Sequence, residues 1–207
     1  MEMISGAAIS KAVASAITGK CVAVYKNHKR EKLLNVLKDS NLSVDSNQLQ
    51  KDEFIASYLA TERALEKSIS DAKVNALTSM FYRGVESQKL FEQYDVYQEV
   101  LSIVTDLSER ELHLMYHLYQ FSEQTNNSSS DPDELAKQQH EYLADKLGIS
   151  REMVKAILVR LRRTGLILSE SELNDEYAFM FQTGFELMHA SQLAKDLKHW
   201  IAFSVET

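Results

Sequence analysis

The sequence contains very few of the residues that interrupt or cross-link a chain. One proline and six glycines in 207 residues leave few positions at which a regular element has to end. Leu, Ala, Glu and Lys are abundant instead, and these residues favour helix. We therefore predict a mainly α-helical protein. A chain of this length forms one large domain or two small ones, with a substantial core.

A disulfide framework and a membrane-spanning segment are also missing. Cys21 is the single cysteine, as expected in a reducing compartment, and the predicted location is the cytoplasm. No run reaches the roughly 18 apolar residues that a membrane helix needs. The segment from Met3 to Lys26 comes closest, but Lys11 and Lys20 interrupt it. We interpret it as a close-packed helix, with a helix lying on a membrane surface as the alternative.

The chain lacks positive charge, most of all in its second half. The net charge is −7, and residues 107–207 carry 10 basic and 16 acidic residues, against 13 and 14 in residues 1–106. An acidic chain disfavours non-specific binding to nucleic acid, although a local basic patch can coexist with a negative total.

The apolar spacing predicts helices in the first half and a domain boundary near Asp106. Residues 1–105 are interpreted as a helical packing or dimerisation region, and a homodimer is expected because the long region Lys51–Arg83 is amphipathic. Ser70 or Asp71 is expected to break that region with a fresh N-cap. The predicted helices cover Ser5–Lys38, Lys51–Arg83 and Asp95–Thr105.

The second half is predicted to contain helices and one β-hairpin. Ser108 and Glu111 have the spacing of a capping box and predict a helix start. After the helices comes an apolar strand, then an acidic turn, then a strand in which Tyr177, Phe179 and Phe181 alternate. A final helix is expected from Thr183, with Glu186 three residues later. The other two predicted helices cover Glu134–Leu147 and Arg151–Thr164.

The stretch "LADKLGISREMVKAILVRLRRTGLIL", Leu143 to Leu168, predicts a helix, a tight turn, a second helix and a strand. Gly148 can adopt the positive φ that ends the first helix, and Ser150 can cap the second. Four apolar residues then fall on one face of the second helix and are expected to be buried. They are Val154, Ile157, Leu158 and Leu161.

This stretch resembles the winged helix-turn-helix family, whose sequences often contain Leu-Ala-x-x-Leu-Gly-(Ile or Val)-Ser. The resemblance covers roughly residues 107–200. It implies a mainly α fold, with an N-terminal helical region followed by a winged helix-turn-helix domain over residues 106–207 that includes a small two-stranded β-hairpin. The function it implies is that of a DNA-binding, transcription-regulator-like protein. The whole chain also resembles small bacterial proteins that have a helical half before a winged helix.

The resemblance places the helix over residues 151–164 in the major groove of double-stranded DNA, with Ser150 at its start. Lys155 and Arg163 are then expected to reach base edges, Arg151 and Arg162 to hold phosphates, and Val159 or Ala156 to touch a thymine methyl group. Arg160 lies on the other flank of this helix.

Acidic residues near this helix leave a second interpretation open. Glu152 and the turn residues Glu170, Glu172, Asp175 and Glu176 would repel a polyanion. The alternative is a non-enzymatic protein-interaction module. It would dock a protein partner through the acidic turn and the Ala156–Val159 patch.

The sequence contains no recognisable catalytic arrangement. His113 and His117 have the spacing of two metal ligands on one helix, but no third ligand is apparent, so we interpret them as a surface pair. Nucleophile-elbow, phosphate-loop and dinucleotide patterns are absent. The predictions are therefore no enzyme activity, no catalytic residue, no metal and no cofactor.

Overall fold

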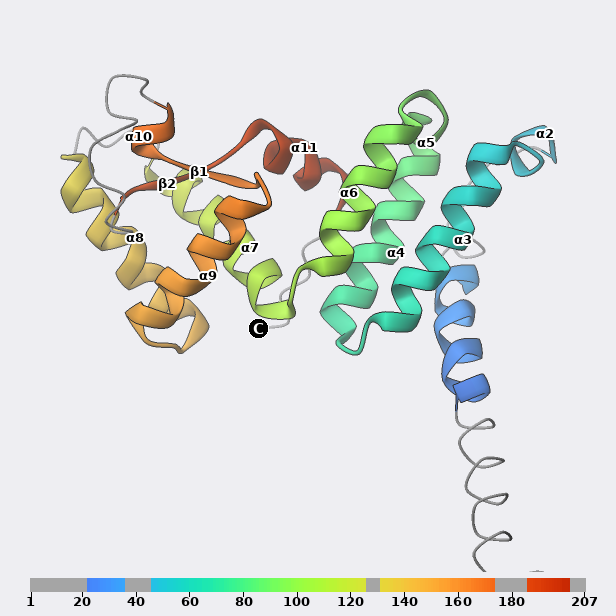
Figure 1. Cartoon of the computed structure of the whole chain (residues 1–207), viewed down its shortest axis with the longest axis horizontal. Coiled ribbons are helices and arrows are strands. Elements are labelled where there is room, and N and C mark those ends of the chain that lie inside the picture. The colour runs from blue at the N-terminus through green and yellow to red at the C-terminus, as the bar shows by residue number, and fades with distance from the viewer. Residues whose placement is uncertain (1–21, 36–45, 126–130, 174–185, 202–207) are drawn as a thin grey trace, which may run out of the picture.

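The structure, a computed structural model, describes residues 22–35, 46–125, 131–173 and 186–201. Helices dominate these residues, and one small antiparallel sheet accompanies them, which confirms the mainly α prediction (Figure 1). Residues 22–35 are helical, within the predicted helix Ser5–Lys38. The other bounds are α2 (Ser46–Leu49), α3 (Asp52–Lys67), α4 (Asp71–Glu86), α5 (Lys89–Glu92), α6 (Tyr94–Asp106), α7 (Glu109–Thr125), α8 (Pro132–Leu147), α9 (Arg151–Arg163), β1 (Ile167–Ser169), α10 (Glu170–Leu173), β2 (Met188–Ala190) and α11 (Gln192–Trp200).

Helices α3, α4 and α6 pack against one another in the N-terminal half. The predicted break at Ser70 is confirmed, because the Ser70 side chain accepts a hydrogen bond from the Lys73 N–H at 3.3 Å and caps α4. Between α3 and α6, the buried hydroxyls of Thr61 and Tyr97 are 2.7 Å apart. The apolar faces of these helices are therefore used within one chain, which accounts for much of the amphipathic pattern between Lys51 and Arg83.

The capping box at the start of α7 is confirmed. The Glu111 N–H donates to the Ser108 hydroxyl at 3.3 Å, and the Ser108 N–H donates to the Glu111 carboxylate at 2.7 Å. Only Leu107 and Ser108 separate α6 from α7, and Leu107 is buried. The hydrophobic core runs continuously from the N-terminal helices into α7 and beyond.

The sheet joins β1 to β2, with Leu168 opposite His189. The prediction of a final helix from Thr183 is wrong, because Met188–Ala190 is extended and α11 begins at Gln192. The physical reason is non-local: β2 pairs with β1, and the side-chain amide of Gln139 in α8 bonds both backbone groups of Met188, each at 2.9 Å. Ser191 caps α11 in place of Thr183. The predicted strand with Tyr177, Phe179 and Phe181, like Thr183 itself, lies outside the described residues.

Helix α11 returns to the N-terminal helices and packs against α4 (Figure 1). The Trp200 ring lies 5.6 Å from the Tyr97 ring, centroid to centroid. Gly84 makes this approach possible, since a Cβ at that position would lie 3.3 Å from both rings. The Arg83 guanidinium donates to the backbone carbonyl groups of His199 and Ile201. The last described helix thus connects the second half of the chain to the first.

Candidate nucleic-acid interface

Helix α9 is held by a tight turn and by its buried face. α8 ends at Gly148 in the left-handed region (φ 59°), and the Ile149 N–H donates to the Ala144 carbonyl at 3.1 Å. The Ser150 side chain then accepts from the Met153 N–H at 3.3 Å and caps α9. The four apolar residues predicted to be buried in α9 are all buried, namely Val154, Ile157, Leu158 and Leu161.

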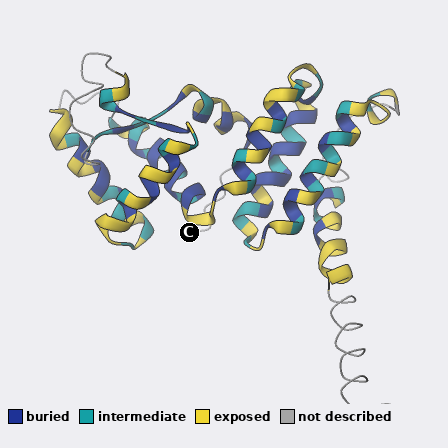
Figure 2. Cartoon of the chain, viewed as in Figure 1, coloured by how far each residue is buried: buried dark blue, intermediate teal, exposed yellow. Residues whose placement is uncertain are grey.

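The opposite face of α9 is open to solvent over its whole length. Glu152, Ala156, Val159 and Arg163 recur at helical spacing on this face, and all four are exposed (Figure 2). Met153 beside them is 44% exposed. The outer face therefore offers small and apolar contacts in the middle, with charge at both ends.

Arg151 and Arg163 are the exposed cations among the predicted contact residues. Arg151 forms an ion pair with Glu141 of α8, but both side chains are more than half exposed, so the pair is worth little and a phosphate can replace the carboxylate. Among the described residues, no ion-pair partner of Arg163 is found. Lys155 is half-buried and lies close enough to His140 to affect its pKa.

Arg160 and Arg162 are engaged with other parts of the chain. Arg160 is 3.0 Å from the carboxylate of Glu111, the buried capping residue of α7. Arg162 was expected to hold a phosphate, but it is 2.8 Å from Glu172 of α10 and its side chain is only 16% exposed. In this arrangement both arginines contact the neighbours of α9, although the side chain of Arg160 remains 62% exposed.

The described part of the acidic turn is also bonded within the chain. Glu172 accepts from the Ser169 N–H at 2.8 Å, and its hydrogen bond with Arg162 is the largest cause that lowers its pKa. Glu170 pairs with His189 across the sheet. The charge of Glu172 is therefore partly neutralised by Arg162, which weakens its expected repulsion of DNA and its use for docking a protein. Asp175 and Glu176 lie outside the described residues.

Glu152 is fixed at the start of α9. Its own backbone N–H and the Ser150 side chain hold its carboxylate, and both lower its pKa. A carboxylate at a helix N-terminus stabilises the helix. It also places a negative charge beside Arg151 at the start of α9.

Two buried polar residues behind α9 were not anticipated. Gln139 and His140 of α8 are 1% and 2% exposed. Their spacing from Ala136 and Leu143, three or four residues on either side, places them on the buried face of α8, and the sequence pattern contained that information. Gln139 anchors β2, and His140 lies beneath the cations of α9.

His140 gives the stability of the fold a dependence on pH. Burial is the largest cause that lowers its pKa, the Glu186 backbone opposes it, and Lys155 and Arg151 lower it further. The unfolded chain then binds a proton more readily than the folded chain, so stability falls as the pH drops below about 6.5, the ordinary histidine value. We expect the urea midpoint to decrease between about pH 7.5 and pH 5.5, and to decrease less in His140→Gln. An equal decrease in both proteins would contradict this role.

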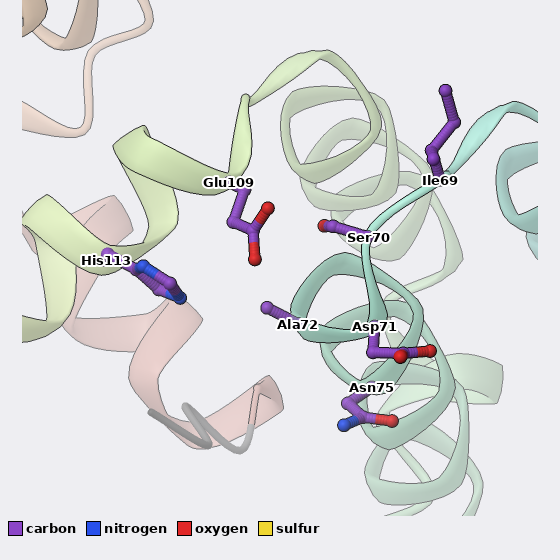
Figure 3. A pocket seen from close by; sticks show the side chains of 7 residues that line it. All are labelled: Ile69, Ser70, Asp71, Ala72, Asn75, Glu109 and His113. Atoms are coloured by element: carbon purple, nitrogen blue, oxygen red, sulfur yellow. The ribbon is translucent and has the colours of Figure 1, made fainter. Parts of the chain in front are cut away.

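His113 and His117 do not converge on one site. The His117 ring lies between the rings of Tyr116 and Tyr142, at 5.1 Å and 6.3 Å between centroids, and burial is the main cause that lowers its pKa. His113 points instead toward a cavity of about 470 Å³ between the starts of α4 and α7 (Figure 3). The residues that line this cavity are Ile69, Ser70, Asp71, Ala72, Asn75, Glu109 and His113.

Metal-ligating side chains do not gather in this cavity or elsewhere in the described ranges. No group of three or more His, Cys, Asp or Glu residues there is arranged to hold a metal ion. Within the same residues, no helix has the length and apolar character required to cross a membrane.

Comparison of the chain with models of protein families, with curated proteins and with solved structures found no match.

Proposed function

We propose that the chain binds double-stranded DNA through the outer face of α9, as a non-enzymatic protein of the transcription-regulator type. The observation that carries the proposal is a capped helix, held by a tight turn, whose whole outer face is exposed. A helix of this width fits the major groove when nothing of its own protein covers it. The resemblance of residues 107–200 to winged helix-turn-helix proteins points the same way.

The structure leads us to divide the six predicted contact residues into two groups. Arg151, Lys155, Val159 and Arg163 are proposed to contact DNA, with Arg163 toward bases or phosphates near the end of α9 and Val159 toward a thymine methyl group. Ser150 and Arg162 are proposed to position the helix, because the first caps it and the second is bonded to Glu172. Arg160 joins the positioning group through Glu111.

The number of cations proposed to contact DNA sets the expected strength of binding. Each phosphate that a protein neutralises contributes about −0.9 to the slope of log K against log salt, so three cations predict a slope of about −3 for one copy. Pairing of two copies on two half-sites would double this value. We include a homodimer in the proposal, and a monomeric mass by light scattering on a saturated duplex would contradict that part.

Removal of the three proposed cations tests the function. The triple variant carries Arg151→Ala, Lys155→Ala and Arg163→Ala. In fluorescence anisotropy with a pool of labelled genomic duplexes, we expect it to bind about a hundredfold more weakly near 50 mM salt, and we expect its affinity to depend less steeply on salt. The control is Arg63→Ala, Lys67→Ala, Lys195→Ala, which removes the same charge from exposed positions on α3 and α11. Equal losses in both proteins would mean that α9 is not the binding surface.

The second candidate function is docking of a protein partner on α9. The exposed, uncharged surface of Met153, Ala156 and Val159 supports it, as does the internal pairing of Arg160 and Arg162. Exposed apolar groups next to one another are typical of binding surfaces. This candidate predicts no shift of any duplex at low salt, whereas the DNA proposal predicts a shift that weakens as salt is added.

A further inference from the structure

A groove of about 250 Å³ lies between α3 and α6, on the half of the chain that the DNA proposal does not use. Its floor consists of small or apolar side chains: Ala60, Ala64 and Leu101, of which Ala64 is 5% exposed and Leu101 3%. The wall that α6 contributes is polar, and its residues are Gln98, Ser102, Thr105 and Asp106.

The wall that α3 contributes is positively charged. Arg63 and Lys67 line the groove, both are exposed, and they stand one helical turn apart. Within the described ranges neither side chain has an ion-pair partner. Asp106 on the facing wall also lines the groove, so the two cations and this carboxylate leave one positive charge in excess there.

The acidic residues next to these cations in the sequence are already occupied. Glu62 pairs with Arg30, and Glu66 pairs with Lys26 at 2.7 Å, so residues 22–35 neutralise the acidic stripe of α3. Helix α3 therefore carries opposite charges on two faces. The negative face is paired with residues 22–35, and the positive face lies along the groove. Among the described residues, no carboxylate forms an ion pair with this positive face.

We propose that the groove between α3 and α6 is a docking site for an acidic amphipathic helix of a partner protein. Carboxylates four residues apart on that helix face Arg63 and Lys67, whose own spacing is the same. Small apolar side chains of the partner lie on Ala60, Ala64 and Leu101, as in other helix-in-groove complexes.

Selection from a phage-displayed library of helical peptides tests this proposal with the full-length protein. We expect the enriched peptides to carry Glu or Asp four residues apart, with Ala or another small residue between them. Synthetic peptides from the selection are then measured by fluorescence anisotropy. For the double variant Arg63→Glu, Lys67→Glu, we expect the affinity of these peptides to fall at least about tenfold, because the carboxylates of the peptide are then repelled by the groove.

The matched control is Arg151→Glu, Arg163→Glu, which makes the same change of charge on α9. The peptides are expected to bind this control as they bind the wild type, and circular dichroism establishes that both variants are folded. Peptides without acidic enrichment, or peptides that bind Arg63→Glu, Lys67→Glu with unchanged affinity, would overturn the proposal. Both outcomes are independent of whether α9 binds DNA.

Discussion

Replacement of Trp200 by alanine is expected to lower the free energy of unfolding by about 3–5 kcal/mol, the usual range for removal of a buried tryptophan. Trp200 is 3% exposed, and its ring fills the space between Gly84 and Tyr97. Urea denaturation followed by circular dichroism measures the change.

Two comparisons make the Trp200 experiment specific. Leu49→Ala removes a side chain that is 47% exposed, and we expect a change of less than about 0.5 kcal/mol. In the wild type, Trp200 is the single tryptophan, so its fluorescence reports on the contact between α11 and α4. Its transition is expected to coincide with that of circular dichroism, because the core is continuous. Separate transitions would show that the halves unfold independently.

Replacement of Gln139 by leucine is expected to cost about 2–5 kcal/mol, since a buried backbone donor and a buried acceptor of Met188 each lose their partner. Leucine keeps nearly the same volume, so the loss reports on hydrogen bonds more than on packing. We expect amide hydrogen exchange in β2 to accelerate together with the change in unfolding free energy.

The neighbouring glutamine provides the control for this variant. Gln138 is exposed and bonds only to Glu134 on the same helix, at 3.3 Å, so Gln138→Leu is expected to change stability by less than about 0.5 kcal/mol. If Gln139→Leu were as stable as Gln138→Leu, Gln139 would not be what holds β2 in place.

The sequence was informative wherever the structure depends on neighbours along the chain. Ser70, Ser108 and Ser150 cap helices as expected, since a cap joins groups two or three residues apart. Gly148 ends α8 for a similar reason, because a positive φ is a local requirement. The buried face of α9 followed from its apolar spacing alone.

Non-local contacts account for what the sequence did not predict. The bond that fixes β2 joins residues 49 positions apart, so nothing near Met188 distinguishes a strand from the start of a helix. Arg160 and Glu111 are equally distant along the chain, so the spacing of residues within α9 gave no indication of their ion pair. The partner of Arg162 could not be predicted from the sequence either, since Glu172 reaches it only because β1 packs against α9.

The most direct measurement of the central claim is the affinity of Val159→Glu for duplex DNA. Val159 lies in the middle of the outer face of α9 and is 37% exposed. The control is Val96→Glu, at a valine of α6 that is 41% exposed. We expect binding to weaken at least about tenfold in Val159→Glu, because a carboxylate would enter the groove beside the phosphates, and to remain unchanged in Val96→Glu. Unchanged binding in Val159→Glu would contradict the claim that α9 enters the major groove.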